Sequence, residues 1–379
     1  MTMGILIMDG FDFGGTEEIL HKWNTGAGLN TEGTLVAGLG PFGGQCWEND
    51  PIPQSRKRFA QQLASGVSNI KTLLYMFEVA SGGGAGMERI IIYENRGGAA
   101  AKHLTLRIDD TQELFILRGT TPELGRSSAG NANGGKISVA SWYHLECRFE
   151  ISNSIAASGC QVFVDGELWI DLPAGTDTRN AGTTGLCDLV VFGADATVTT
   201  ARYRMDDIVL VDEEGPVSTA KLFGRHIIET ANLISTGATN DFAVVGGPTS
   251  SVSAVNSSTR DGDVTHIAAS TVGDTELFVA SALSADQNTE VFGIQINTYA
   301  RKSDVFPKTY NHVVVASGTS ALPFIMSADK ALTLGNSTGP LDSAAYAYNR
   351  DIFVSNPAGA GVQWVISEVE AAQYGLVIT

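Results

Sequence analysis

The 379-residue chain is poor in charged side chains, especially basic ones, and contains no long hydrophobic run. Only 17% of its residues are charged, against about 25% in an ordinary soluble domain. Lys and Arg number 24 and Asp and Glu number 41, which gives a net charge of −17. A chain this acidic lacks the cationic surface that binding to a phosphate backbone needs, so we expect no nucleic-acid partner. No stretch approaches the roughly 18 apolar residues of a membrane-spanning helix, so we also expect no membrane insertion.

The N-terminus lacks an export signal, and the cysteines lack the spacing of a metal site. The first residues hold one short apolar run, Ile5 to Met8, without a basic start or a signal-peptide core. We therefore expect the chain to be made in a cytosol. The cysteines are Cys46, Cys147, Cys160 and Cys187. They form no CxxC pattern and are expected to be free buried thiols, although Cys147 and Cys160 can pair if their strands are adjacent.

Glycine is abundant, with 43 residues, and it separates short segments that are apolar or alternate with period two. Such segments predict strands, and Asp165-Gly166 between two apolar runs predicts a tight hairpin. A short helix is predicted over 16–22, and a strand is favoured over a helix for 55–64. Nine further strands are predicted over 72–80, 89–94, 104–108, 113–117, 143–150, 161–164, 167–170, 186–192 and 203–211. Strands joined by turns, without βαβ alternation, predict an all-β antiparallel sandwich.

The acidic, Gly-Pro punctuated stretch from Asp212 to Pro216 is the best candidate for a domain boundary. It divides the chain into a first domain, 1–213, and a second β-rich domain, 214–379. Strands in the second part are predicted over 222–228, 242–245, 276–280, 291–298, 311–316, 351–355 and 363–366.

Three segments carry a resemblance to the concanavalin-A-like (laminin-G-like) jelly roll. They are Ser141 to Glu146 (SWYHLE), Gln161 to Gly166 (QVFVDG) and Arg204 to Leu210 (RMDDIVL). The resemblance covers about residues 5–213. It implies that Trp142 covers the end of a sheet, that Asp165-Gly166 forms the turn, and that the third segment closes the sandwich.

The arrangement of the whole chain resembles virion structural proteins of tailed bacteriophages. The segments that carry this likeness are MDGFDF (8–13), Lys22-Trp23, 206–215, 240–242, Val255-Asn256, 270–278 and 364–375. The resemblance implies a particle component, often in the tail or an appendage. The missing export signal agrees with it, because phage proteins assemble in the host cytoplasm.

The concanavalin-A-like fold also hosts glycosidases, which need two carboxylates beside the scissile bond. The laminarinase-like branch places them in an E-x-D-x-x-E run, which this chain lacks. The nearest pair is Glu167 and Asp171, but the third carboxylate is missing and Pro173 ends the strand. A G-x-S-x-G elbow is also missing, and the glycine-rich stretches 38–44 and 82–86 lack the G-K-[ST] ending of a phosphate loop. We therefore assign no catalytic residue and expect no enzymatic activity.

Acidic pairs at turns are candidates for calcium ligands: Asp109-Asp110, Asp206-Asp207 and the segment Arg260 to Asp263. None has EF-hand spacing, and paired acids at turns are usually solvated, so no metal or cofactor is assigned. The six histidines, none within five residues of another, are His21, His103, His144, His226, His266 and His312. The basic triplet Arg56-Lys57-Arg58 is either a solvated loop or a docking point for an acidic neighbour.

The sequence thus predicts a non-enzymatic structural component of a tailed-phage particle: a tail, collar or capsid-decorating protein. Its expected partners are other virion proteins and further copies of itself, contacted through sheet faces and polar loops. The main alternative is an appendage protein that binds a host-surface glycan or receptor. A polysaccharide hydrolase is a third, less favoured reading.

Overall fold

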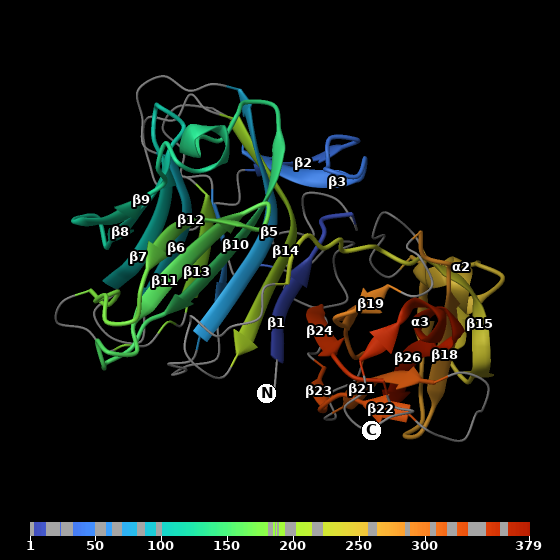
Figure 1. Cartoon of the computed structure of the whole chain (residues 1–379). Coiled ribbons are helices and arrows are strands. Elements are labelled where there is room, and N and C mark those ends of the chain that lie inside the picture. Colours follow the sequence, from blue (N-terminus) through green and yellow to red (C-terminus); the bar gives the residue numbers. More distant parts are fainter. Residues whose placement is uncertain are drawn as a thin grey trace. The chain divides into compact units, whose positions relative to one another are not determined.

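The computed structural model is all-β and divides into two compact units, residues 1–228 and 229–379 (Figure 1). The all-β class predicted from the sequence is confirmed. The domain boundary expected after residue 213 stays a prediction. The structure describes residues 4–12, 23, 33–49, 58–62, 70–81, 88–95, 101–180, 185, 187, 189–193, 202–213, 223–256, 264–284, 289–303, 308–316, 324–332, 346–356 and 363–379.

The first unit contains an eight-stranded and a six-stranded antiparallel sheet. The large sheet has the order β12-β11-β10-β5-β14-β3-β2, with β1 also paired to β14. Its strands are β1 (Gly4–Asp9), β2 (Gly33–Ala37), β3 (Gln45–Asn49), β5 (Ile70–Ser81), β10 (Trp142–Glu150), β11 (Gly159–Val164), β12 (Glu167–Leu172) and β14 (Arg202–Glu213). Neighbours far apart in sequence, such as β5 between β10 and β14, are the crossovers of a jelly-roll sandwich. The predicted jelly roll is therefore confirmed.

The small sheet has the order β4-β13-β6-β7-β8-β9. Its strands are β4 (Arg58–Gln62), β6 (Glu88–Asn95), β7 (Ala101–Ile108), β8 (Leu114–Arg118), β9 (Glu123–Arg126) and β13 (Leu189–Gly193). The 3₁₀ helix η1 (Ala132–Gly135) lies between β9 and β10. The strand favoured within 55–64 is confirmed as β4, whereas the helix predicted over 16–22 lies outside the described residues.

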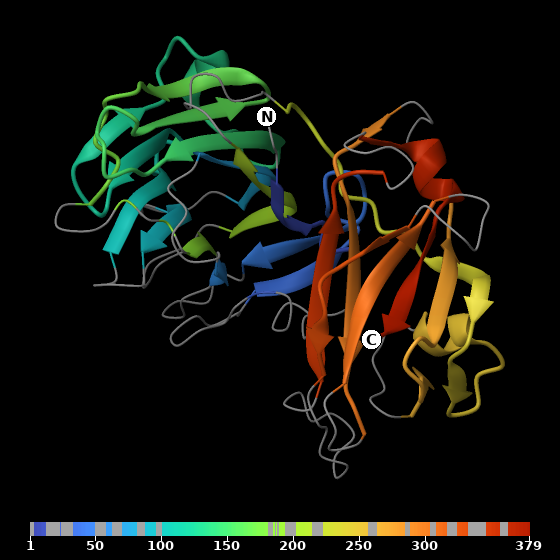
Figure 2. The same cartoon turned by 90° about the horizontal axis from the view of Figure 1, so that it is seen from below.

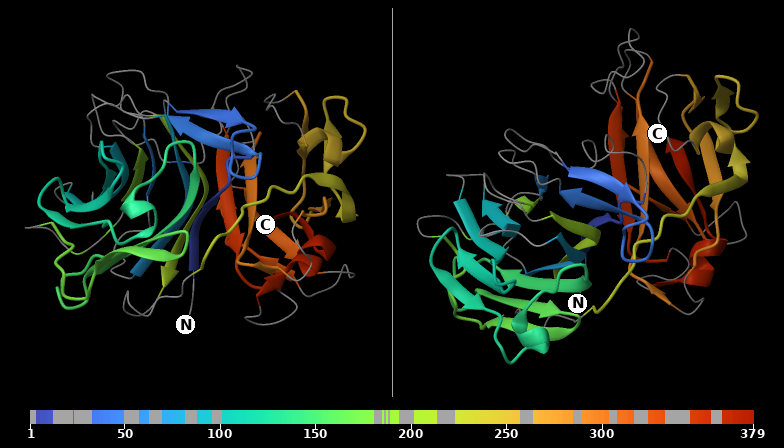
Figure 3. Two further views of the ribbon diagram at one scale, coloured as in Figure 1. Left: turned by 45° about the horizontal axis from the view of Figure 1, so that its top comes forward. Right: turned by 90° about the horizontal axis from the view of Figure 1, so that it is seen from above.

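The core of the first unit lies between its two sheets, which face each other in the views of Figure 3. Alternate residues of each strand reach it because side chains of a strand point to opposite faces. On β5 these are Leu73, Tyr75 and Phe77, and on β7 they are Leu104 and Leu106. The other residues of the large-sheet strands therefore point to its outer face.

The hairpin predicted at Asp165-Gly166 joins β11 to β12. Both residues have positive φ, 48° and 84°, as the type of turn that suits hairpins requires. The Asp165 carboxylate also accepts a hydrogen bond of 2.9 Å from the backbone N–H of His144. Trp142 begins β10 and is half-buried.

The second unit is built on a six-stranded sheet of order β15-β18-β26-β21-β22, with β23 paired to β21. Figure 2 shows β18, β26 and β21 side by side. The strands are β15 (Leu233–Asn240), β18 (Thr275–Ala280), β21 (Thr309–Val315), β22 (Phe324–Met326), β23 (Lys330–Ala331) and β26 (Gln373–Ile378). Three two-stranded ribbons are β16 (Ala243–Val245) with β17 (His266–Ala268), β19 (Glu290–Val291) with β25 (Trp364–Val365), and β20 (Ile294–Ala300) with β24 (Ala347–Phe353). The helices are α2 (Ser251–Val255) and α3 (Ile366–Ala371).

The β20–β24 ribbon packs on the six-stranded sheet through an apolar cluster centred on the fully buried Trp364. Val314 and Tyr374 of the sheet meet Phe353 and Ile296 of the ribbon there. No described helix is long and apolar enough to cross a membrane.

Two predictions about the second part are wrong in detail. Residues 223–228, predicted within a strand over 222–228, have no strand structure. The strand predicted over 363–366 is only two residues long and runs into α3.

Candidate functional site

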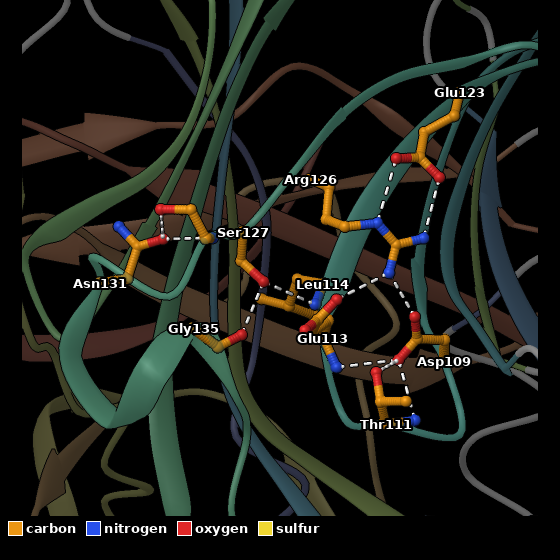
Figure 4. Close-up of polar contacts among 10 residues, drawn as sticks. Asp109, Thr111, Glu113, Leu114, Glu123, Arg126, Ser127, Asn131 and Gly135 are labelled. Atoms are coloured by element: carbon orange, nitrogen blue, oxygen red, sulfur yellow. Dashed lines mark hydrogen bonds and ion pairs between the residues drawn. The ribbon is translucent and has the colours of Figure 1, made fainter.

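The turn at Asp109-Asp110, a calcium candidate from sequence, is stabilised by an arginine (Figure 4). Asp109 Oδ1 accepts hydrogen bonds from Thr111 Oγ1 (2.7 Å) and from the backbone N–H groups of Thr111 and Glu113 (3.0 Å each). Its second oxygen pairs with Arg126, which also binds Glu113 and Glu123 at 2.9 Å each. Burial favours a higher pKa for Asp109, but these hydrogen bonds outweigh it and hold the pKa below its usual value. The positive charge beside this turn is therefore the Arg126 guanidinium, and the turn is a structural unit.

The second acidic pair, Asp206-Asp207, is buried rather than solvated, so the expectation of a solvated turn is wrong. The two residues are only 4% and 2% exposed. The register of β14 against β5 shifts between Asp206 and Val209, and Asp207 has a positive φ of 48°. The pair therefore lies at a β-bulge of β14. Burial raises both pKa values; the neighbouring Asp207 carboxyl raises that of Asp206 further, and Asp12 raises that of Asp207.

One oxygen of each carboxyl group in this pair accepts a backbone hydrogen bond. Asp206 Oδ1 accepts a hydrogen bond from the Asp207 N–H, and Asp207 Oδ1 accepts one from the Ile228 N–H, both at 2.8 Å. Asp207 Oδ2 is buried without a hydrogen-bond partner among the described residues. Among all the residues that the structure describes, no three His, Cys, Asp or Glu side chains are grouped so that they could hold a metal ion. The third calcium candidate, 260–263, lies outside the described residues.

The segment Phe223–Ile228 lies on the outer face of the large sheet, held by side chains of β10 and β14. Glu146 Oε2 accepts hydrogen bonds from the N–H groups of Phe223 (3.2 Å) and Gly224 (3.4 Å). His226 places Nδ1 3.3 Å from His144 Nε2 and Nε2 2.6 Å from the Asp207 carbonyl oxygen. The chain thus covers its own sheet through polar contacts.

Burial determines the protonation of these outer-face groups. It lowers the pKa of His144 to about 3, with further contributions from His226 and Arg225. Burial also lowers the pKa of His226 and raises that of Glu146, which Arg148 partly offsets. Sequence spacing could not reveal the histidine pair, because 82 residues separate its members.

A further charged cluster on this face joins three strands. Arg204 of β14 lies 2.7 Å from Glu48 of β3 and 2.8 Å from Glu78 of β5. The acid pair weighed for catalysis is placed on β12, where each member has other partners. Glu167 accepts hydrogen bonds from the Ala132 N–H (3.1 and 3.2 Å), and Asp171 accepts one from Gln161 (3.1 Å).

All four cysteines are free and buried, as expected; Cys147 faces Val162 across the strand pair, while Cys160 faces Phe149. The glycine-rich stretch 38–44 forms the β2–β3 hairpin turn. Arg58 begins β4, whereas Arg56, Lys57 and the stretch 82–86 lie outside the described residues.

The second unit contains a buried network that the sequence did not indicate. Thr298 Oγ1 lies 2.8 Å from His312 Nε2, and His312 Nδ1 lies 2.5 Å from Asp351 Oδ2. Hydroxyl, imidazole and carboxylate follow in the order of a hydrolase triad. However, His312 is 0% exposed, and the Thr298 hydroxyl also lies 2.5 Å from the hydroxyl of the buried Tyr310. Burial lowers the pKa of His312. We interpret the network as a tie between the ribbon and the sheet.

The opposite face of the same ribbon carries polar and aromatic side chains, which we call the tyrosine ladder. Ile294 and Ile296 of β20 pack on the core, so the odd-numbered residues of β20 point away from it. Strand register places the partners of those residues directly opposite, at even-numbered positions of β24. Register gives the ladder Gln295, Asn297, Tyr299, Tyr348, Arg350 and Ile352, and ring contacts beyond the strand ends add Tyr346 and Arg301; all eight are half-buried.

Contacts within the tyrosine ladder order its side chains. Tyr299 and Tyr346 stack with ring centroids 4.7 Å apart and an interplanar angle of 8°. The Arg301 guanidinium lies over the Tyr346 ring, 5.4 Å from its centroid. The Tyr348 hydroxyl donates a hydrogen bond of 2.8 Å to Asn297 Oδ1. The alternation of polar and aromatic residues was visible in the sequence, but the pairing of the two strands was not.

No family model matches the chain, and no curated protein matches it either. Several solved structures are similar to part of it at low identity. The Trypanosoma rangeli sialidase in complex with the inhibitor DANA has a TM-score of 0.34 and 17% identity, over 46% of this chain and 26% of the sialidase. The cellulose induced protein Cip1 has a TM-score of 0.39 and 13% identity, over 55% of this chain and 99% of Cip1. The carbohydrate-binding module CBM66 from Bacillus subtilis has a TM-score of 0.30 and 13% identity, over 48% of this chain and 93% of the module. The chain thus spans about a quarter of the sialidase, and at these TM-scores the likeness carries no functional argument.

Proposed function

We propose that the protein is a non-enzymatic structural component of a tailed-phage particle that works through contacts with other proteins. The observation that carries this proposal is the closure of the large sheet by Phe223–Ile228. On that face His144 and Glu146 bind the chain's own segment, while Arg204 pairs with Glu48 and Glu78. These polar side chains thus bind the protein's own backbone and side chains. The exposed turns of the sandwich remain for contacts with partners.

The β2–β3 turn offers such a contact. Leu39 and Phe42 are 39% and 47% exposed at its tip. The Arg225 guanidinium lies 5.0 Å from the centroid of the Phe42 ring and orders it. Large apolar side chains that share one exposed tip favour contact with another protein.

The proposal is tested by quantitative mass spectrometry of particles purified from the phage that encodes the chain. We expect the protein at a copy number that is a multiple of the particle's symmetry. A Phe42→Ser variant should fold normally and be incorporated less, while the same change at the buried Phe77 should prevent folding. Absence from purified particles would overturn the proposal.

A second candidate is an appendage that binds a host-surface glycan, favoured by the tyrosine ladder. Aromatic rings beside amide and guanidinium groups are the side chains that bind sugars by stacking and hydrogen bonding. A glycan array probed with the full-length protein tests this candidate. An assay of polysaccharide viscosity on the same preparation distinguishes binding from hydrolysis.

A further inference from the structure

The tyrosine ladder differs in charge from the unit that carries it. Residues 229–379 contain 14 acidic and six basic residues. Five of the six basic residues fall between positions 301 and 350, and two of them, Arg301 and Arg350, belong to the ladder. None of the eight ladder residues is acidic. The nearest carboxylate in sequence, Asp351, points to the opposite face of the ribbon, where it binds His312 and Lys330.

From this juxtaposition we propose that the tyrosine ladder binds an acidic polysaccharide, a chain of sugars that bear carboxylate groups. The proposal deepens the second candidate function and rests on it. Tyrosine rings stack on the apolar C–H faces of sugar rings, and amide groups bind sugar hydroxyls. A guanidinium forms paired hydrogen bonds with a carboxylate, which a neutral sugar cannot provide.

The ladder is long enough and ordered enough for such a ligand. Residues two apart on a strand are separated by about 7 Å, so its four rungs span about 20 Å. This length suits several consecutive sugars rather than one. Asn297 holds the Tyr348 hydroxyl, Tyr346 stacks on Tyr299, and the ribbon beneath is fixed to the core by Phe353. Side chains that are ordered before binding lose less entropy when the ligand arrives.

The composition of the ladder favours a glycan over a protein partner. Ile352 is its one aliphatic residue, whereas amide, hydroxyl and guanidinium groups occupy the other positions together with the tyrosine rings. Protein interfaces usually have an apolar centre, which this face does not offer. A protein partner is therefore an outcome to be tested.

The experiment measures binding of the full-length protein to immobilised oligogalacturonate, hyaluronate and polysialate. The matched controls are the methyl esters of the same polymers, which keep the rings and remove the charge. We expect binding to at least one acidic polymer, weakened about tenfold or more by esterification. Affinity should also fall as the salt concentration rises.

Variants separate the roles of the side chains. Tyr299→Ala should weaken binding to the acidic polymer and to its ester alike. Arg350→Gln should weaken binding to the acidic polymer about tenfold and leave the ester unchanged. Arg118→Gln in the first unit is the control for loss of one arginine and should change neither. Thermal unfolding of each variant shows that the second unit remains folded.

The possible outcomes are distinguishable. Equal binding to acid and ester, unaffected by Arg350→Gln, would overturn the acidic specificity and leave a glycan-binding function in place. Binding to none of these polymers, or cross-linking of position 348 to a particle protein alone, would overturn the inference. The particle proposal is decided separately, by the composition of purified particles.

Discussion

Replacement of Arg204 by methionine should destabilise the first unit far more than loss of an ordinary surface charge. Its guanidinium bridges Glu48 and Glu78, and the three side chains are only 16%, 10% and 7% exposed. Methionine retains most of the apolar stem but removes the cation beside Glu78 and leaves Glu48 only the more exposed Arg202, at 3.4 Å. Removal of one partner from a buried ionic cluster costs about 3–5 kcal/mol.

Urea unfolding measures this loss. Four of the five tryptophans lie in the first unit and Trp364 lies in the second, so a Trp364→Phe background restricts the fluorescence signal to the sandwich. With a urea dependence of about 3 kcal/mol per molar, the midpoint should fall by about 1 M or more.

Arg118→Met is the matched control. Arg118 lies 2.9 Å from Asp177, but both side chains are 30% exposed, so the loss should be about 1 kcal/mol or less. The triple variant Glu48→Gln, Glu78→Gln, Arg204→Met should regain part of the lost stability, because no buried charge remains unpaired. If Arg204→Met costs no more than Arg118→Met, the reasoning from burial is refuted.

Three further predictions concern other parts of the chain. Gly375→Val should unfold the second unit, because a Cβ atom at this position would lie 1.8 Å from the Glu276 carbonyl oxygen. Circular dichroism and thermal unfolding measure the effect. The control is Gly130→Ala, which should be tolerated because its Cβ would meet nothing closer than 3.6 Å. A thiol reagent should modify Cys147 and Cys160 only in urea, because both are buried and burial raises their pKa values; rapid labelling of the native protein would contradict this. His144→Gln should reduce the loss of stability on acidification. The pKa of His144 is about 3 in the folded protein and 6.5 when unfolded, so the wild type loses stability as the pH falls below about 6.5. Urea unfolding at pH 7 and pH 5 measures this loss, and an equal loss in variant and wild type would contradict the prediction.

The period-two strands of the first unit could be predicted from sequence because each buries one face, which fixes the alternation. The tight turn at Asp165-Gly166 was equally visible, since few residues tolerate its backbone angles. By contrast, β26 was missed because Gly375 interrupts an apolar run and resembles a turn residue. Its role is instead to let the backbone of β18 approach closely.

The candidate sites depended on contacts that sequence could not supply. Asp206-Asp207 has the composition of a solvated turn, yet the pair is buried at the bulge in β14, where Asp207 binds the backbone of Ile228. The segment 223–228 was predicted as a strand, yet its backbone N–H groups at 223, 224 and 228 bond to side chains of β10 and β14 and form no ladder with a neighbouring strand. The tyrosine ladder required the register of β20 against β24, which joins residues about fifty positions apart.

The position of β26 has a consequence for biosynthesis. This strand separates β18 from β21, yet it is translated almost a hundred residues after the first and some sixty after the second. Until residues 373–378 leave the ribosome, the sheet of the second unit has a gap at its centre. The sandwich, whose last strand is β14, is complete much earlier in translation. The two units should therefore fold in sequence, and a nascent chain arrested near residue 350 should carry a protease-resistant sandwich followed by a protease-sensitive tail.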